Sequence, residues 1–335
     1  MLILTEQNLR QVLTMAEVIG AIERGLIAVS RGETIVPDRL RMNIPWAGAV
    51  LFEMPAGLSP HDQAGPDEGA LSGAVGTKLV TVFPNNSRLN IPTVQSAYFL
   101  LDGETGVPLA LMEGRFVTAI RTAATSAVAT KSMASAGGKR LAVLGAGVQG
   151  AFHIDAMREI CEVTRVVIAS RSPDRAEALA QRTRNRMGLE ASVTTAADAV
   201  SSCDLICTCT TSPGPLFDGR TIQPGTHINA VGAFTPDTRE LDTEAIRRAR
   251  VVIDSASAAG REAGEILIPL AEGAIMPVHI AGELADVVSG RIRGRTSVEE
   301  ITVFKSCGLA IEDLVTARLA YSNALARGIG TSVGF

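Results

Sequence analysis

The pattern of hydrophobic and polar positions changes once along the chain. Thr14 to Glu17 form a capping-box pattern. The apolar residues that follow, between Val18 and Val29, recur at helical spacing and predict an amphipathic helix. From Ile35 to Leu111, short apolar runs broken by proline and glycine predict a sheet. Inside that region, Pro60 to Gly76 is rich in Gly, Pro, Asp and Ala and has no periodicity, so we expect a loop.

A regular alternation of apolar strands and helical segments begins after Gly137-Gly138. The strands expected are Leu141–Leu144, Val166–Ala169, Asp204–Cys209, Ile228–Val231 and Val251–Ile253. Helical patterns at Pro173–Arg186 and Thr243–Arg248 lie between some of them. Such alternation is typical of an α/β fold with a parallel sheet covered on both faces.

Two helices flank this second region. Arg115 to Ala136 is rich in Ala and Thr and predicts a helix that leads into it. Gly308 to Arg327 predicts an amphipathic helix, which we expect to pack back on the first region. The sequence therefore predicts a discontinuous α+β domain, residues 1–122 and 309–335, around an inserted α/β domain, residues 123–308.

Composition narrows the class of protein. A chain of 335 residues suits two domains, and 46% hydrophobic with 20% charged residues is typical of a well-packed globule. The net charge of −4 gives no general attraction for nucleic acid or for anionic membranes, so neither partner is expected. The start, MLILTEQNLR, does not resemble a signal peptide, and no apolar run approaches a membrane-spanning length, so we expect a cytoplasmic protein.

The cysteines do not form a metal-binding pattern. The five, Cys161, Cys203, Cys207, Cys209 and Cys307, include no C-x-x-C pair. We interpret them as buried thiols, with metal binding or catalysis as the weaker alternatives, and expect no metal site.

A glycine motif follows the first strand of the second region. Gly145 allows a tight turn, Gly147 lets the backbone approach a pyrophosphate, and Gly150 lets the next helix, beginning near Val148, sit close to the strand. A pyrophosphate is favoured at such a helix N-terminus, although a purely structural glycine turn is the alternative. The motif predicts a Rossmann domain, a doubly wound parallel sheet. The residues expected to bind the dinucleotide here are Gly145, Ala146, Gly147, Val148, Gln149 and Gly150.

The end of the next strand bears on the choice between NADH and NADPH. NAD-selective sites carry an acidic residue at the position of Ser170, and this chain has none there. Ser170, Arg171, Ser172 and Arg175 offer donors and positive charge that suit a 2′-phosphate, so we expect NADPH, with NADH left open. The alternative interpretation, compatible with the first, is that Ser172-Pro173 caps the next helix and the arginines are solvated.

Cations in the first region stand among apolar or small residues. They are Lys78, Arg121 and one of Arg39 and Arg41. An unpaired buried charge is costly, so such cations have an anionic partner or reach the surface. The composition leaves open whether that partner is a ligand or a protein carboxylate.

Several motifs together resemble the ornithine cyclodeaminase/μ-crystallin family. They are Ala74–Asn86, Pro92-Thr93, Ala119–Ser126, Gly145–Gln149 with His153, and Phe304–Ser306 with Gly308, in order over nearly the whole chain. The resemblance implies a Rossmann domain inserted into a substrate-binding and dimerisation domain, and hence a homodimer. The family includes ketimine and pyrroline-2-carboxylate reductases, an alanine dehydrogenase, iminosuccinate reductase, cyclodeaminases and a hydroxyproline dehydratase.

The resemblance also implies roles for individual residues. Lys78 and Arg121, with Arg41 as the third cation, would hold the substrate carboxylate, and Thr93 would add a hydrogen bond. Lys78 is also a candidate for proton transfer at an imine nitrogen, although carboxylate binding alone is an equal alternative. The residues expected near the nicotinamide are Thr210, Thr211, Ser212, Val231, Gly232 and Ser306.

One departure from the family pattern separates its subgroups. Cyclodeaminases carry an aspartate in G-x-D-x-P-G-x-x-E-L, where this chain has Phe234, which cannot exchange a proton. We therefore expect reduction of a small imine with a carboxylate, Δ1-pyrroline-2-carboxylate or its six-membered analogue, to the L-amino acid. The alternatives are reduction of a linear 2-imino acid, a lyase reaction on cis-3-hydroxy-L-proline or ornithine, and a non-catalytic NADPH-binding protein. The Pro60 to Gly76 loop is long for the family and could alter the substrate pocket or the dimer edge, or be inert.

Overall fold

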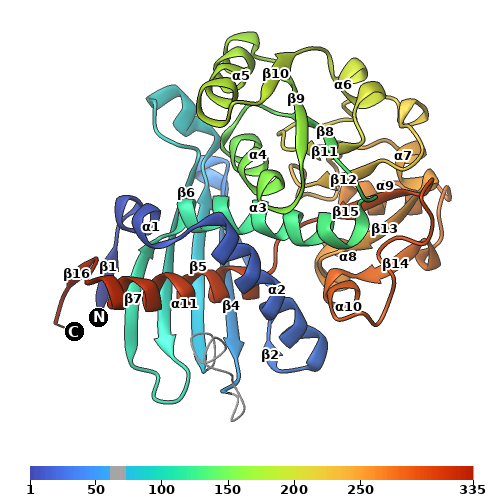
Figure 1. Ribbon diagram of the computed structural model, residues 1–335. Coiled ribbons are helices and arrows are strands. Elements are labelled where there is room, and N and C mark those ends of the chain that lie inside the picture. The colour runs from blue at the N-terminus through green and yellow to red at the C-terminus, as the bar shows by residue number, and fades with distance from the viewer. Residues whose placement is uncertain (61–72, 335) are drawn as a thin grey trace. The chain divides into compact units, whose positions relative to one another are not determined.

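The computed structural model describes residues 1–60 and 73–334. The chain divides into two compact units, Met1–Thr122 with Leu309–Phe335, and Ala123–Gly308. These bounds coincide with the two domain boundaries expected from the sequence. Figure 1 shows the ribbon of both units.

The first unit is built on an eight-stranded sheet in the order β16-β1-β7-β6-β5-β4-β2, with β3 paired to β4. Its strands are β1 (Leu2–Leu4), β2 (Thr34–Ile35), β3 (Leu40–Ile44), β4 (Ala49–Leu58), β5 (Ala74–Val82), β6 (Val94–Asp102), β7 (Pro108–Glu113) and β16 (Thr331–Ser332). Its helices are α1 (Glu6–Val12), α2 (Met15–Arg31) and α11 (Ala310–Arg327), with short 3-10 helices η1 (Pro45–Ala47) and η2 (Pro84–Leu89). The helix α3 (Gly114–Met133) begins in this unit and continues into the second.

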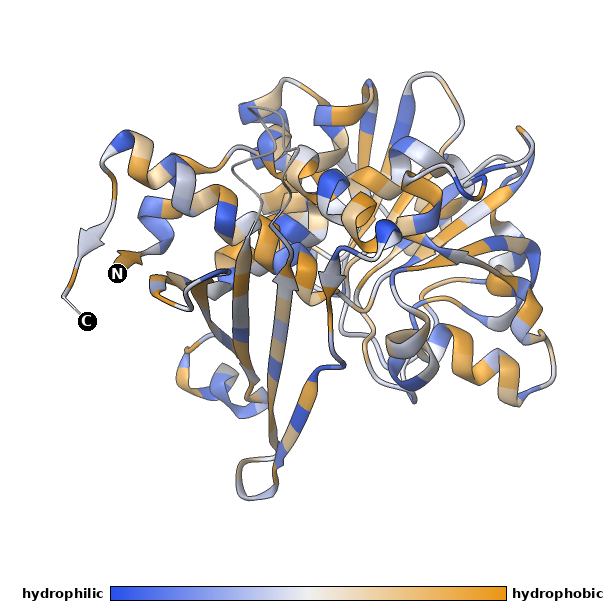
Figure 2. Ribbon diagram, turned by 90° about the horizontal axis from the view of Figure 1, so that it is seen from below, coloured by the Kyte–Doolittle hydropathy of each residue, from blue (hydrophilic) through white to orange (hydrophobic). Residues whose placement is uncertain are grey.

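One face of the first sheet is covered by helices. The capping box of Thr14 and Glu17 starts α2, as predicted, and Gly32 ends it in the left-handed conformation. The helix α11 packs against α2 and crosses β4, β5 and β6, as Figure 1 shows. Buried residues alternate with more exposed ones along β4. Figure 2 shows hydrophilic and hydrophobic residues following one another along the long strands. The C-terminal helix therefore supplies part of the first unit's core, as predicted.

The second unit is a parallel sheet of eight strands in the order β10-β9-β8-β11-β12-β15-β13-β14. The strands are β8 (Lys139–Leu144), β9 (Val163–Ala169), β10 (Glu190–Val193), β11 (Leu205–Thr208), β12 (His227–Ala230), β13 (Ala249–Ile253), β14 (Ile280–Glu283) and β15 (Ile301–Lys305). The helices are α4 (Val148–Ile160), α5 (Pro173–Met187), α6 (Ala196–Ser202), α7 (Thr243–Arg248), α8 (Ala256–Glu262), α9 (Gly264–Ala271) and α10 (Leu284–Val288), with η3 (Gly219–Thr221) and η4 (Pro277–His279).

Strand order reverses in the middle of this sheet. The chain runs outward from β8 to β9 and β10, then returns to β11 on the other side of β8. Because crossovers between parallel strands are right-handed, this reversal places helices on both faces. On one face, Ala199, Val200 and Ile246 of α6 and α7 pack on strand residues such as Ile206 and Ile228. The predicted α/β class is confirmed, and the reversal between β8 and β11 is where such sheets bind ligands.

Several elements differ from the sequence expectations. The structure adds α1 and short strands such as β1, β10 and β16, whose few residues give too short a pattern to recognise. The strand β5 begins at Ala74, so the last residues of the predicted Pro60–Gly76 loop belong to a strand. The charged residues of that loop, His61, Asp62, Asp67 and Glu68, lie outside the described residues. Across the described part of the chain, no helix is both long and apolar enough to cross a membrane.

Candidate functional site

The glycine turn after β8 has the geometry that the motif predicts. Gly145 has a φ of +120°, and a Cβ there would lie 2.4 Å from the carbonyl oxygen of Cys209. A Cβ at Gly150 would lie 2.0 Å from the carbonyl oxygen of Gly145, so only glycine allows α4 to sit this close to the turn. Gly147 is the N-cap of α4 and faces open space, which leaves its backbone accessible to a ligand.

A pocket of about 510 Å³ opens over this turn. Its lining includes Gly145, Ala146 and Gly147 after β8, Ser170, Arg171, Ser172 and Arg175 after β9, and Thr210, Thr211 and Ser212 after β11. All of these were predicted to bind the cofactor, and the pocket brings them together at the carboxyl ends of three neighbouring strands. Sequence reasoning missed the part of the wall made by Thr194, Thr195 and Ala196, which precede or begin α6.

The remaining predicted cofactor residues do not line the pocket. Val148, Gln149 and Gly150 form the first turn of α4. Val231 and Gly232 follow β12, and Ser306 follows β15 and is buried. Val231, Gly232 and Ser306 stand just beyond strand ends of the same sheet, and their expected place beside the nicotinamide stays a prediction.

The pocket wall after β9 carries positive charge. Arg171 and Arg175 both line it, and no residue among the described lining is acidic. Ser172 is the N-cap of α5, followed by Pro173, but its side chain makes no capping hydrogen bond. The Ser172 amide instead donates to the hydroxyl oxygen of Ser170 at 3.2 Å. Ser172 therefore occupies the N-cap position, as the capping interpretation expected, but its side chain does not cap the helix. The Ser172 hydroxyl remains available to a ligand.

Among the described residues the five cysteines form no disulfide. Cys203 and Cys207 are buried, as interpreted from the sequence, whereas Cys161, Cys209 and Cys307 are only partly buried. Burial raises the pKa of Cys207 to about 12, so this thiol stays protonated at neutral pH. Cys209 lies just beyond the end of β11 and lines the pocket.

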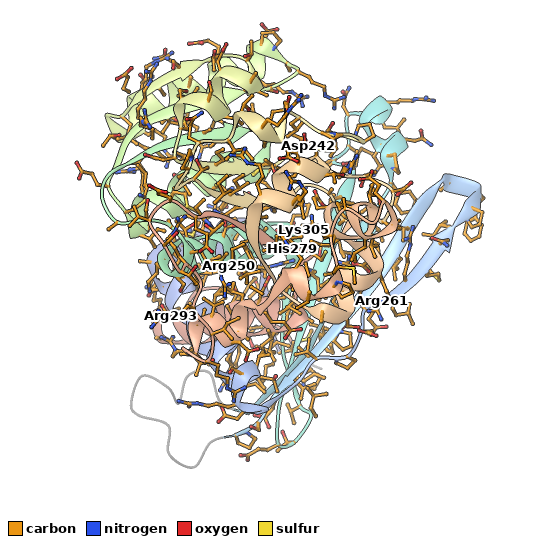
Figure 3. The ribbon with its side chains drawn as sticks, turned by 90° about the vertical axis from the view of Figure 1, so that its right-hand side faces the viewer. Asp242, Arg250, Arg261, His279, Arg293 and Lys305 are labelled. Atoms are coloured by element: carbon orange, nitrogen blue, oxygen red, sulfur yellow. The ribbon has the colours of Figure 1, made fainter. Side chains whose placement is uncertain are left out.

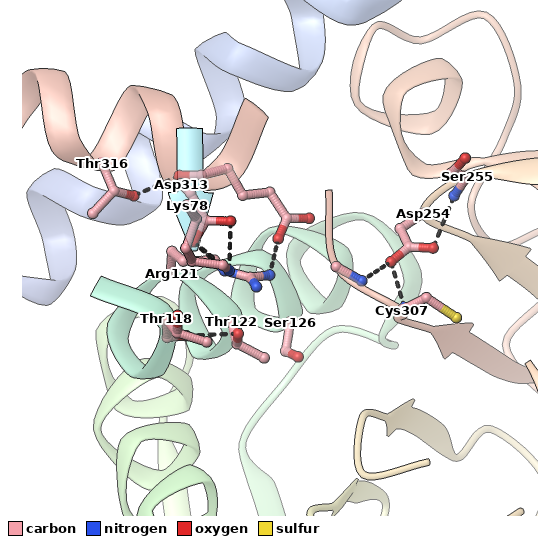
Figure 4. Close-up of polar contacts among 12 residues, drawn as sticks. Lys78, Thr118, Arg121, Thr122, Ser126, Asp254, Ser255, Cys307, Asp313 and Thr316 are labelled. Carbon is pink, nitrogen blue, oxygen red and sulfur yellow. Dashed lines mark hydrogen bonds and ion pairs between the residues drawn. The ribbon is translucent and has the colours of Figure 1, made fainter. Parts of the chain in front are cut away.

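In the first unit, Lys78 and Arg121 lie in one buried charged cluster. Lys78 on β5 is 1% exposed and Arg121 on α3 is 5% exposed. The Lys78 Nζ atom lies 2.9 and 2.7 Å from the two carboxylate oxygens of Asp313, and Arg121 Nε lies 3.1 Å from one of them. Arg121 also pairs with Glu312. Figure 4 shows Lys78 and Arg121 pointing to the same carboxylate of α11.

The charges within this cluster balance. Two cations face two carboxylates, so Lys78 and Arg121 have protein partners in addition to any ligand. Burial, helped by the positive charge of Arg121, lowers the pKa of Lys78 to about 8. Sequence reasoning missed Glu312 and Asp313. The available signal was an adjacent acidic pair at the start of a helix rich in buried apolar residues.

Tyr98 is a further buried polar residue beside this cluster. It pairs with Lys78 in the register of β5 and β6 and is fully buried. Among the described residues its hydroxyl has no hydrogen-bond partner. Burial, with the negative charge of Asp313, raises its pKa well above the usual value, so the phenol stays protonated.

Arg41 lies on the same face of the sheet as Lys78 but outside the charged cluster. The register pairs Arg41 with Phe52 and Phe52 with Val80, and Val80 is two residues from Lys78. Arg41 is exposed, stacks over the Phe52 ring at 5.9 Å, and donates to Asn43. Arg39, the other candidate for the third cation, stacks on the same ring at 4.9 Å. The structure therefore does not bring the third cation into the cluster of Lys78 and Arg121, and the role of Arg41 in substrate binding stays a prediction.

Two other predicted positions lie at strand ends. Thr93 directly precedes β6 and is half-buried, and its carbonyl oxygen accepts a hydrogen bond from Phe83 at 2.8 Å. Phe234, in the place of the cyclodeaminase aspartate, follows β12 and is partly exposed.

Together, the strand, glycine turn and helix with their pocket define the second unit as a Rossmann-type dinucleotide-binding domain. It is joined to a mixed α+β unit that holds a buried cation cluster. The chain belongs to the ornithine cyclodeaminase/mu-crystallin family, whose profile matches residues 1–328. The family resemblance predicted from the motifs is confirmed.

Three full-length similarities make the relationship more specific. A Δ1-pyrroline-2-carboxylate reductase of Bacillus cereus (strain ZK / E33L) is 37% identical over 337 residues, covering 100% of both chains. The structure of Thermococcus litoralis Δ1-pyrroline-2-carboxylate reductase in complex with NADH and L-proline matches with a TM-score of 0.93 and 38% identity, over 99% of this chain and 100% of that one. An archaeal alanine dehydrogenase dimer with bound NAD matches with a TM-score of 0.91 and 32% identity, over 100% of this chain and 99% of that one.

Proposed function

We propose that this chain is an NAD(P)H-dependent imine reductase. Its substrate is a small cyclic imine with a carboxylate, Δ1-pyrroline-2-carboxylate or Δ1-piperideine-2-carboxylate, and its product is the L-amino acid. The observation that carries the proposal is the full-length match to a reductase whose structure holds NADH and L-proline.

The first unit binds the substrate in this proposal. Lys78 and Arg121 hold the carboxylate together with Arg41, because an ammonium supplies a point charge and a guanidinium a planar fork of donors. Thr93 adds a hydrogen bond. Asp313 and Glu312 keep the two buried cations charged and oriented when no substrate is bound.

The reaction adds one hydride and one proton across the C=N bond. A reduced nicotinamide held by the second unit would supply the hydride for the imine carbon. The Lys78 ammonium donates the proton to the nitrogen, and its pKa of about 8 suits proton transfer near neutral pH. The carboxylate clamp fixes the imine carbon for attack, so this chain contributes positioning and charge stabilisation.

The second unit binds the cofactor, and we assign NADPH as the preferred form. Residues Gly145 to Gly150 bind the pyrophosphate at the start of α4. Ser170, Ser172, Arg171 and Arg175 bind a 2′-phosphate, supported by the absence of acidic residues from the described lining of the pocket. Thr210, Thr211, Ser212, Val231, Gly232 and Ser306 border the nicotinamide half.

An absorbance assay tests this function directly. Purified protein is mixed with NADPH or NADH and with Δ1-pyrroline-2-carboxylate, Δ1-piperideine-2-carboxylate, or pyruvate plus ammonia. Oxidation of the cofactor with a cyclic imine, and formation of L-proline or L-pipecolate, is the expected result. Tight cofactor binding without turnover of any imine would instead identify a non-catalytic binding protein.

Reduction of a linear 2-imino acid is the second candidate, because an alanine dehydrogenase matches over the full chain. A carboxylate clamp does not by itself distinguish a ring from an open chain. Turnover of pyruvate plus ammonia alone would favour this candidate. A lyase reaction on ornithine is disfavoured by Phe234, and turnover of cis-3-hydroxy-L-proline without net cofactor oxidation would reveal a dehydratase.

We also propose that the protein forms a homodimer through the first sheet, as the alanine dehydrogenase forms a dimer. The face opposite α11 carries apolar side chains that stay exposed, Val75 at 41%, Leu79 at 46% and Leu111 at 37%. Apolar side chains that stay exposed on one face of a sheet are typical of a protein interface. The cytoplasmic location stays a prediction.

A further inference from the structure

A buried carboxylate joins the ends of two neighbouring strands in the second unit. Glu240 is fully buried. Its Oε2 atom accepts hydrogen bonds from the Thr208 hydroxyl at 2.6 Å and from the Gly232 amide at 2.7 Å. Its Oε1 atom accepts from both the amide and the hydroxyl of Thr210, each at 2.7 Å. Because β11 ends at Thr208 and Gly232 follows β12, one side chain connects both strand ends.

These hydrogen bonds reach the wall of the cofactor pocket. The Thr210 hydroxyl donates to Glu240 and accepts from the amide of Ser212 at 3.1 Å, and both residues line the pocket. A Cβ at Gly232 would lie 2.1 Å from the Thr210 carbonyl oxygen and 2.6 Å from Glu240 Oε1, so the two loops are closely packed. The orientation of the Thr210 to Ser212 segment therefore depends on the Glu240 carboxylate.

A second layer of buried charges holds Glu240 itself. The Glu240 amide donates to Glu265 at 3.0 Å, and the other oxygen of Glu265 lies 3.0 Å from Lys305 Nζ. Lys305 ends β15, and its ammonium also donates to the carbonyl oxygen of Ala233. Lys305 is fully buried and is labelled in Figure 3. The network thus ties the ends of β11, β12 and β15, three strands that are adjacent in the sheet.

Glu240 does not line the pocket, so its effect on a ligand must pass through the residues that it holds. A buried carboxylate with four donors is well satisfied, and removing its charge leaves donors without an acceptor. Donors that lose their acceptor move or bind water, and here they would do so beside the bound dinucleotide.

We propose that Glu240, anchored by Glu265 and Lys305, is a positioning residue that preorganises the Thr210 to Ser212 wall for the dinucleotide. The inference rests on the cofactor site of the proposed function, and it does not depend on which imine is reduced. Binding of the cofactor, rather than of the imine, is the step that this residue controls.

The test is a direct titration of the cofactor without any imine. The dissociation constants of NADPH and NADH are measured by the fluorescence of the reduced nicotinamide for the wild type and for Glu240→Gln. We expect both constants to rise roughly 10- to 100-fold in the variant, the range that corresponds to one or two lost charge-assisted hydrogen bonds. At saturating cofactor, the KM for the imine stays within about 3-fold of the wild type, since the buried charged cluster of Lys78 and Arg121, the proposed substrate site, belongs to the other unit.

Asp242→Asn is the matched control. Asp242, labelled in Figure 3, accepts from the amides of Gly219 at 2.9 Å and Ala245 at 2.7 Å, and does not line the pocket. Loss of the Asp242 carboxylate weakens the start of α7 and lowers the Tm, but leaves the dissociation constants of NADPH and NADH unchanged. Equal cofactor constants for Glu240→Gln and the wild type, with a lower Tm alone, would overturn the proposal.

A milder variant decides the question if Glu240→Gln fails to fold. Thr208→Val removes one of the four donors and keeps the shape of a buried side chain that lies outside the pocket lining. We expect a smaller rise in the same two dissociation constants. Unchanged constants in Thr208→Val would then overturn the proposal. Because every measurement uses cofactor alone, a wild type that binds NADPH but reduces no imine would contradict the proposed function without affecting this test.

Discussion

Lys78 and Asp313 are 235 positions apart in the chain, and their charged atoms lie 2.7 Å from each other at the closest contact. Both side chains are buried, and Arg121 shares the same carboxylate. This contact makes the C-terminal helix part of the proposed substrate site, because it determines how the two cations are held.

Removing the charge of Asp313 destabilises the protein. In Asp313→Asn the buried cations Lys78 and Arg121 face only one remaining carboxylate, that of Glu312. The unpaired buried charge lowers the free energy of unfolding by about 3–5 kcal/mol. Urea unfolding measures the loss. The control is Asp218→Asn, since Asp218 pairs with Arg220 on the surface and its removal is expected to have no measurable effect. Equal stability of the two variants would show that the buried cluster does not stabilise the fold.

The catalytic efficiency on the imine falls as the pH rises through about 8. The pKa of Lys78 is lowered to about 8, so the side chain is an ammonium below this pH and a neutral amine above it. The neutral amine neither attracts the carboxylate nor donates a proton. A profile of kcat/KM between about pH 6 and pH 9.5 measures the effect.

Lys78→Arg separates the two roles of this residue. Arginine stays charged over the whole range and holds a carboxylate, but it does not donate a proton. We expect a KM for the imine close to that of the wild type and a kcat lower by roughly 10²- to 10⁴-fold. The part of the fall in kcat/KM near pH 8 that comes from Lys78 should be absent. Since the imine also titrates, this variant reports the substrate's own contribution to the profile. A wild-type kcat in Lys78→Arg would restrict Lys78 to carboxylate binding.

The arginines of the cofactor pocket select the phosphorylated cofactor. The double variant Arg171→Ala/Arg175→Ala loses both guanidinium groups of the wall after β9. We expect the KM for NADPH to rise roughly 10- to 100-fold while that for NADH changes little. Arg182→Ala is the control, because Arg182 is exposed further along α5 and does not line the pocket. An equal rise in the KM for NADPH and for NADH would argue against a role of these arginines in recognising the 2′-phosphate.

A charge on the exposed face of the first sheet prevents dimer formation. Leu79→Glu places a carboxylate among apolar side chains that the proposed interface would bury, and burial of an unpaired charge is unfavourable. Size-exclusion chromatography with light scattering should show monomers, whereas the control Val278→Glu, on an exposed position of η4, remains dimeric. A dimer that survives Leu79→Glu would place the interface elsewhere.

Features encoded by neighbouring residues were predictable from the sequence. The glycine turn at Gly145 to Gly150 depends on one strand, one turn and one helix, which the sequence presents in order. The capping box at Thr14 and the amphipathic helix ending at Arg327 are similarly local. The alternation of strands and helices then fixed the α/β class, because few other arrangements bury such strands.

Features that depend on distant contacts were not predictable in this way. Asp313 reads as one polar residue at the start of a helix, where an acid is favourable in any case. Its pairing with Lys78 follows only from the packing of α11 on β5. Glu240 is one charged residue in the segment after Phe234, and its four donors come from two different strand ends. Side-chain networks of this kind require the three-dimensional fold.

The division of the first unit into two stretches of chain has a consequence for synthesis. A ribosome makes β5, with Lys78, long before it makes α11, and the whole second unit is translated between them. The chain of the second unit is therefore complete before α11 is made, whereas Lys78 gains its carboxylate partner only when this last helix has been added. A chain that ends before residue 309 would therefore contain Lys78 and Arg121 without the two carboxylates that pair with them.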